Sequence, residues 1–166
     1  MSSSKIVTQR KGDRVDVQVI GFVGEQTDLF QIDLRDVKHL ELNLAHMNYI
    51  NSVGVGGWVK WTGRFTPDMR FTLVECPHLV INQINMVVGF IPKWTEILSF
   101  YLPYACTDCN AEKSLLMKLG TDYEFASAAA PSKINLPEKV ECPNCKAEME
   151  MDVVPSKYLF FLNRSA

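Results

Sequence analysis

The chain has 166 residues, of which 47% are hydrophobic and 22% are charged. This composition is typical of a globular protein with a real core and unlike that of disordered or fibrous chains. The length allows one ordinary domain and a small appended module, but not two full-size domains. Lys and Arg number 17 against 19 Asp and Glu. No basic run is present to follow a phosphate backbone, so nucleic acid is disfavoured as a partner.

The sequence carries no signal for secretion or membrane attachment. Residues 1–5 are small and polar, and the strongest apolar stretch, residues 86–91, is far too short to span a bilayer. We therefore expect a cytoplasmic protein with no membrane partner. Thiols stay free in a reducing cytosol, so paired cysteines there indicate metal ligands before disulfides.

Alternating apolar and polar residues predict the strands of an α/β sheet. Val15, Val17 and Val19 alternate with polar residues over 14–20, and three leucines do so over 40–45. Further strands are expected at residues 70–75 and in the extended run 95–104. Residues 27–37 are too irregular to decide between a short helix and a turn.

Two helices are expected between these strands. Asn51 or Ser52 can cap the first helix, in which apolar residues recur every three or four positions as far as Phe65. The second begins at Pro77 and ends near Gly89. The order of strands and helices predicts parallel neighbours joined by right-handed crossovers, with both helices on one face of the sheet.

The character of the chain changes after Tyr104 to cysteine pairs and short apolar runs. Residues 114–119 and 148–153 are predicted to form hairpin strands, and the Ala/Ser/Pro stretch at 126–137 is predicted to be a flexible loop. We expect the aromatic residues at 158–162 to pack on this module, because no basic face accompanies them. The predicted organisation is a domain at 1–100 and a zinc-ribbon-like module at 101–166.

Two Cys-x-x-Cys pairs carry the strongest chemical signal, and they consist of Cys106, Cys109, Cys142 and Cys145. Four thiolates supply the tetrahedral ligands that zinc prefers, with no position left open for water. We therefore predict a structural Zn²⁺ that supplies the stability this thin module lacks. Iron in a rubredoxin-like site and redox-active dithiols are the alternatives. Cys76 is expected to be a small buried hydrophobic residue and not a fifth ligand.

The segment at residues 40–57 reads LELNLAHMNYINSVGVGG and joins a strand to a helix. It resembles the signature of STAS domains, the sulphate transporter and anti-sigma factor antagonist fold, in which a strand runs into an Asp-Ser-(Ser/Thr)-Gly-(Leu/Val) turn. Residues 50–56 match this signature in order, and the resemblance extends over about residues 14–100. It implies a STAS-like mixed sheet with helices packed on one face. With the cysteine tail, the chain is similar to bacterial STAS proteins that carry a C-terminal ribbon.

The resemblance also implies a phosphorylation switch. In STAS antagonists, the serine that matches Ser52 is phosphorylated by a partner kinase, and the added charge breaks the complex. This sequence departs from the signature at two positions, since Asn51 replaces Asp and Val53 replaces the second hydroxyl residue. Ser52 is therefore either a phosphoacceptor or a plain helix cap.

No arrangement of nucleophile, base and acid, and no phosphate-binding loop, is evident, so we expect a protein that is not an enzyme. The leading hypothesis is a regulatory or scaffolding protein whose partner is a serine kinase or an anti-sigma-like regulator, and which can form a homodimer. The alternatives are a nucleic-acid-binding zinc ribbon tethered to a STAS-like dimerisation domain, and a thiol oxidoreductase. The candidate partner-binding residues are Asn51, Ser52, Val53, Gly54 and Val55.

Overall fold

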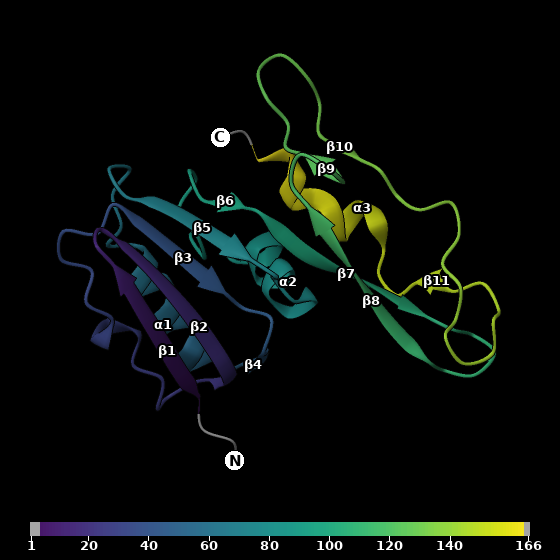
Figure 1. The fold of residues 1–166 in the computed structure, drawn as a ribbon, viewed down its shortest axis with the longest axis horizontal. Coiled ribbons are helices and arrows are strands. Elements are labelled where there is room, and N and C mark those ends of the chain that lie inside the picture. Colours follow the sequence, from purple (N-terminus) through teal and green to yellow (C-terminus); the bar gives the residue numbers. More distant parts are fainter. Residues whose placement is uncertain (1–3, 165–166) are drawn as a thin grey trace.

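The structure, a computed structural model, describes residues 4–164. A large sheet with two helices occupies one end, and a long hairpin with several short strands occupies the other (Figure 1). The strands are β1 (Lys5–Lys11), β2 (Arg14–Val23), β3 (His39–Asn43), β4 (Met47–Ile50), β5 (Arg70–Val74), β6 (Glu96–Ile97), β7 (Ser99–Ala105), β8 (Glu112–Lys118), β9 (Tyr123–Glu124), β10 (Lys133–Ile134) and β11 (Glu150–Met151). The helices are α1 (Ser52–Thr62), α2 (His78–Met86) and α3 (Pro155–Tyr158), with 3-10 turns η1 (Leu29–Gln31) and η2 (Leu159–Asn163).

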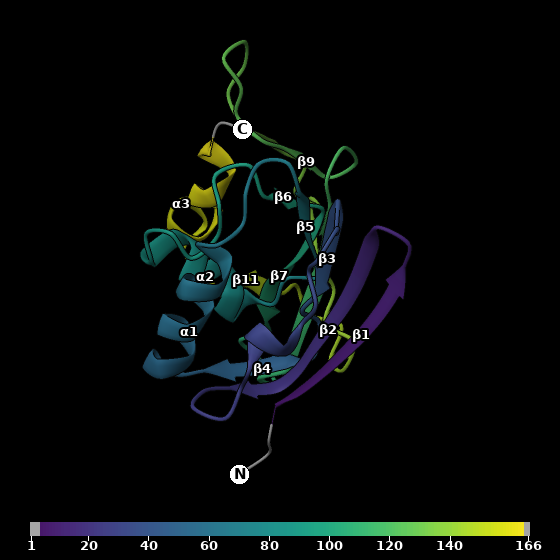
Figure 2. The same ribbon diagram turned by 90° about the vertical axis from the view of Figure 1, so that its left-hand side faces the viewer.

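The large sheet confirms the predicted α/β class. Its order is β1-β2-β3-β5-β6, with β4 also paired to β2. The pairs β2–β3, β3–β5 and β5–β6 are parallel, and β1 is antiparallel to β2, so the sheet is mixed. Figure 2 shows α1 and α2 on the same side of this sheet.

The core lies between the sheet and these helices. Alternate side chains of β2 and β3 are buried, which matches the period-two patterns in the sequence, whereas β5 buries three consecutive residues, Phe71, Thr72 and Leu73. Trp58 and Trp61 of α1 are buried on the sheet, as the helical spacing predicts. Trp58 stacks on Phe90 with ring centroids 5.2 Å apart, and Trp61 meets Phe65 edge-on at 4.8 Å.

Three local features differ from the sequence prediction or complete it. The edge strand β1 is almost wholly exposed, so its sequence shows no buried alternation. The strand predicted from the leucines at 40–45 ends at Asn43, and β4 is a separate strand that pairs with β2. The undecided segment 27–37 contains a single 3-10 turn, which Asp28 caps by accepting a hydrogen bond from the N–H of Phe30 at 3.0 Å.

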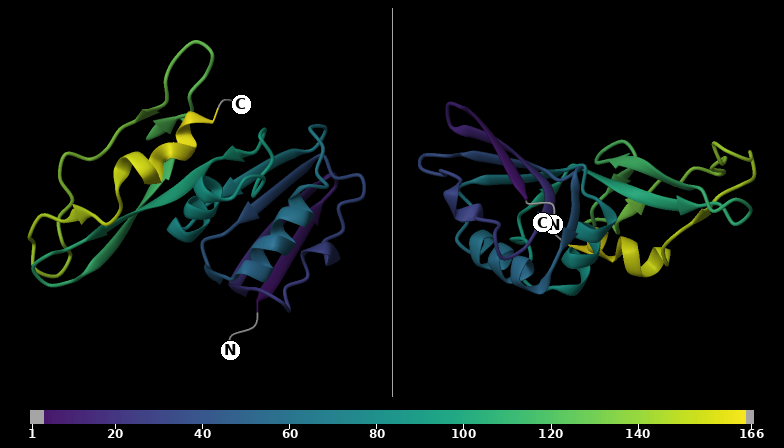
Figure 3. Two further views of the ribbon diagram at one scale, coloured as in Figure 1. Left: turned by 180° about the vertical axis from the view of Figure 1, so that it is seen from behind. Right: turned by 90° about the horizontal axis from the view of Figure 1, so that it is seen from below.

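The hairpin of β7 and β8 links the two ends of the molecule. It extends away from the large sheet, as the view from behind shows (Figure 3). β7 pairs with β8 on one side and with β11 on the other. Residue 100, the last residue of the predicted first domain, lies inside β7. The segment 126–137, predicted as a loop, includes β10, which pairs with β9.

The C-terminal aromatic residues pack against the base of the hairpin, as expected. Phe161 and Tyr123 each meet Phe100 with ring centroids 5.0 Å apart. Tyr158 is buried and donates a hydrogen bond from its hydroxyl to the carbonyl oxygen of Tyr101 at 2.6 Å. Phe160 is the exception, because its side chain is exposed. Within residues 4–164, no helix combines the length and apolar character needed to cross a membrane.

Candidate metal centre

The first cysteine pair lies in the turn that joins β7 to β8. The N–H of Asn110 donates to the carbonyl oxygen of Cys106 at 2.9 Å, and the N–H of Cys106 donates to that of Ala111 at 2.8 Å. Asn110 has a positive φ of 58°, a conformation that asparagine adopts more readily than most residues. These bonds close a tight turn around Cys106 and Cys109.

The second pair lies in a turn built in the same way. The N–H of Lys146 donates to the carbonyl oxygen of Cys142 at 3.1 Å, and the N–H of Cys142 donates to that of Ala147 at 2.8 Å. Lys146 has a φ of 67°. Both turns share the pattern Cys-x-x-Cys-x-Ala. The shared alanine indicates that the two turns are equivalent, which the spacing of the cysteines alone does not.

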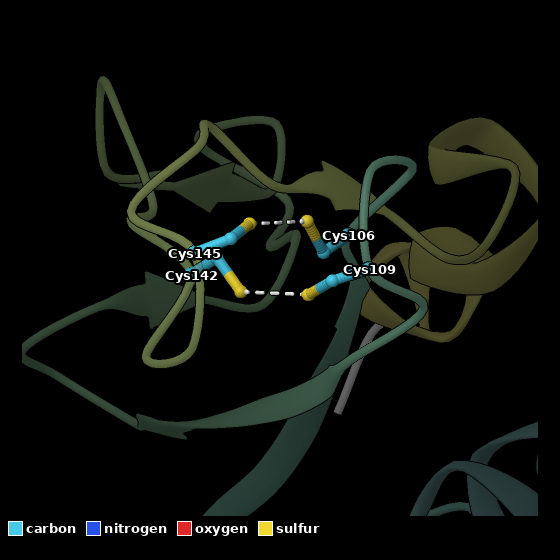
Figure 4. A group of neighbouring side chains, drawn as sticks. All are labelled: Cys106, Cys109, Cys142 and Cys145. Atoms are coloured by element: carbon cyan, nitrogen blue, oxygen red, sulfur yellow. Dashed lines mark hydrogen bonds between the residues drawn. The ribbon is translucent and has the colours of Figure 1, made fainter.

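The two turns face each other and bring the four sulfur atoms together (Figure 4). The Sγ atoms of Cys106 and Cys145 are 3.4 Å apart, and those of Cys109 and Cys142 are 3.5 Å apart. All four Sγ atoms lie within 4.8 Å of one another. A disulfide bond is about 2.0 Å long, so these cysteines are free thiols.

The cluster fits a tetrahedral metal ion. Zinc–sulfur bonds of about 2.3 Å place the sulfur atoms of a tetrahedron about 3.8 Å apart, which falls within the observed range. Cys106 and Cys142 are buried, whereas Cys109 and Cys145 are exposed, so one side of the cluster faces the interior of the module. Four sulfur ligands leave no open position for water, which is the arrangement of a structural site.

Electrostatics within the cluster also favour a cation. The backbone N–H groups of Cys145 and Asn144 lower the pKa of Cys142 to about 6. For Cys145, the N–H of Ala147 lowers the pKa, but the hydrogen bond with Cys106, burial and the other two thiols raise it to about 12. One thiolate therefore suppresses the ionisation of its neighbours. A divalent cation at the centre allows all four to ionise together.

Cys76 is not part of this cluster. It lies after β5, bridges to Phe100 in the adjoining strand and is fully buried. Burial raises the pKa of its thiol well above the usual range, so the thiol stays protonated and unreactive. This confirms Cys76 as a small buried hydrophobic residue.

The residues matched to the STAS signature lie at the start of α1, on a different part of the molecule from the cysteines. Asn51 is the cap of the helix, because its Oδ1 accepts a hydrogen bond from the N–H of Gly54 at 2.8 Å. The amide group of Asn51 also donates to both carboxylate oxygens of Glu25, at 3.0 and 3.1 Å. Ser52 is the first helical residue and is exposed.

The remaining candidate residues differ in accessibility. Val53 is 56% exposed, and Val55 is half-buried. Gly54 is buried against the end of β2, where an added Cβ would lie 2.3 Å from the carbonyl oxygen of Val23. Gly54 therefore allows α1 to approach the sheet closely. Of the five predicted partner-binding residues, Ser52 and Val53 are the exposed ones.

No family model matches the chain, and a search of curated proteins finds no match. The mixed α/β sheet and the four-cysteine cluster are thus the observations on which a function rests, and membership of the STAS family stays a hypothesis.

Proposed function

We propose that this chain is a non-enzymatic adaptor, in which a STAS-like part binds another protein around Ser52 and the four cysteines hold a structural zinc ion. The observation that carries the proposal is that one residue at the start of α1 caps the helix and a different residue offers an exposed hydroxyl group. Asn51 caps the helix, so the exposed hydroxyl of Ser52 is not needed for capping and is free to meet a partner or accept a phosphate.

The surroundings of Ser52 suit a protein partner. Val53 and Tyr49 are both exposed, and Tyr49 is held in place by stacking on Phe22 with ring centroids 5.4 Å apart. Exposed apolar side chains beside a free hydroxyl are the composition of a docking surface that phosphorylation can switch off, because phosphate adds about two negative charges and must be desolvated in the complex. A serine kinase or an anti-sigma-like regulator is the proposed partner.

The nucleic-acid alternative is weaker because the region around the cysteines is acidic. Residues 106–153 contain nine Asp and Glu against five Lys and no Arg. Two of those lysines, Lys139 and Lys146, form ion pairs with Glu148 and Glu141. A surface of this charge repels a phosphate backbone.

Affinity capture tests the proposal when wild-type protein and Ser52→Asp are used side by side. We expect a partner that wild type retains and Ser52→Asp loses, because the carboxylate places a charge in the middle of the docking surface. Ser114→Asp on β8 is the matched control, since Ser114 is also exposed but lies outside α1. Identical partner sets for Ser52→Asp and wild type would contradict a switch at Ser52.

A further inference from the structure

A groove between α2 and α3 forms a second apolar surface, separate from the start of α1. It has a volume of about 540 Å³, and its lining comes from α2, α3 and the segments that flank α3. Met86, Val154 and Phe160 line it and are 69%, 57% and 60% exposed. Val88, just beyond the end of α2, is 99% exposed. Met86, Val154 and Phe160 are three of the nine large exposed hydrophobic residues in the described part of the chain, and Val88 lines a different pocket.

The walls of this groove are fixed relative to each other. The side-chain amide of Asn85 donates to the carbonyl oxygens of Lys157 and Tyr158, at 3.2 and 2.9 Å. These bonds tie α2 to α3, which lie next to each other in Figure 2. A groove that is formed in advance costs less free energy to occupy than one that must be assembled on binding.

Among the residues that line the groove, the one charged side chain is that of Lys157. Residues 76–95 and 153–164 contain no Asp or Glu, although the chain has 19 of them. The same segments carry Lys157, which lines the groove, and Lys93 and Arg164, which line a different pocket. None of these three basic groups pairs with a carboxylate among residues 4–164. An apolar groove whose one charged lining residue is a lysine complements an apolar ligand that carries negative charge.

We infer that this groove binds an acidic amphipathic helix of another protein. The groove is lined by helices and their flanking turns, not by the edge of a sheet, so a partner gains affinity by packing side chains and not by adding a strand. Apolar side chains on one face of the helix fill the groove beside Met86 and Phe160. A carboxylate on the flank of that face pairs with Lys157.

Three synthetic peptides test this inference on the zinc-loaded full chain by fluorescence anisotropy. The peptides share one leucine face at helical spacing and carry Glu, Gln or Lys on the flanking positions. We expect the Glu peptide to bind most tightly and the Lys peptide most weakly. Phe160→Ser should weaken binding of the Glu peptide about tenfold, because it removes an exposed aromatic anchor without opening the core.

Charge reversal at the rim provides the sharper test. Lys157→Glu should weaken the Glu peptide about fivefold and strengthen the Lys peptide. The control Lys113→Glu, on β8, and Tyr49→Ser, beside Ser52, should leave both affinities unchanged. Because Tyr49→Ser and Ser52→Asp address the other surface, failure here and failure of the proposed switch at Ser52 are separable.

Several results would overturn the inference. Equal affinity for the three peptides would remove the charge argument, and so would a Glu peptide that does not bind at millimolar concentration. Binding that survives Phe160→Ser would place the peptide elsewhere. Preferential binding to phosphatidylserine vesicles would assign the surface to a membrane. Concentration-dependent dimerisation that Phe160→Ser abolishes would assign it to a second copy of the chain.

Discussion

Gly54 and Gly56 lie two residues apart in α1 and have opposite surroundings. A Cβ on Gly54 would clash with the carbonyl oxygen of Val23, whereas nothing lies within 4 Å of the Cβ position of Gly56. We expect Gly54→Ala to lower the free energy of unfolding by about 1–3 kcal/mol through overpacking. Gly56→Ala should raise it by about 0.5–1 kcal/mol, because alanine favours a helix over glycine. Urea denaturation measures both, and equal effects would contradict the close approach of α1 to β2.

His39 lies on the face of the sheet that the helices leave open, and it makes the free energy of unfolding depend on pH. Burial, followed by the charges of Arg14 and Arg70, lowers its pKa. Arg14 can only donate, so Nδ1 of His39 accepts its hydrogen bond at 3.0 Å, and Nε2 donates to the hydroxyl of Thr72 at 3.0 Å. Protonation of Nδ1 would break the first bond.

The unfolded chain therefore takes up a proton on His39 at a higher pH than the folded chain does. Stability should fall as pH falls through the unfolded pKa of about 6.5 towards the lower folded pKa. His39→Gln should flatten this part of the stability curve, measured by urea denaturation between neutral and mildly acidic pH. His78→Gln is the matched control, because His78 is exposed at the start of α2. A slope that His39→Gln leaves unchanged would show that another group causes it.

At the scale of elements, each cysteine turn needs one residue with positive φ. Asparagine tolerates this conformation, whereas lysine is strained by its Cβ. We expect Lys146→Gly to raise the midpoint of thermal unfolding of the zinc-loaded protein, with a gain of about 0.5–1 kcal/mol. The ion pair of Lys146 with Glu141 is exposed, so its loss should matter little. Asn110→Gly is the matched control and should gain less. A larger gain at Asn110 would contradict the strain argument.

Elements with one buried face could be predicted from the sequence, and exposed or long-range pairings could not. The spacing of Trp58 and Trp61 reveals α1 because those side chains are buried, although α1 ends at Thr62 and does not reach Phe65 as predicted. β1 has no buried face, and β4 exists through its pairing with a distant strand, so neither leaves a local pattern. The cysteine site, too, could be predicted only in its local part. The cysteine spacing identifies the ligands, but 32 residues separate the pairs, and they meet because β11 pairs with β7 beside them.

At the scale of the whole molecule, the two ends depend on different sources of stability. The large sheet is held by its own core, in which Trp58, Phe71 and Leu73 are fully buried. The far end of the β7–β8 hairpin has few buried side chains, and β11 is only two residues long. A metal ion that joined the two cysteine turns would therefore stabilise an end of the molecule that has little core of its own.

Removal of the metal should loosen one end of the molecule and leave the other folded. We expect about one zinc ion per chain in the purified protein by elemental analysis. A chelator should abolish hydrogen-exchange protection at residues 106–112 and 140–151, while β2, β3 and β5 stay protected. Acid should have the same effect, because protons compete with the metal for thiolates. Cys145→Ser should lose the metal, whereas Cys76→Ala should keep it. Protein that contains no metal, yet keeps residues 140–151 protected, would show that side-chain packing alone holds the cysteine turns together.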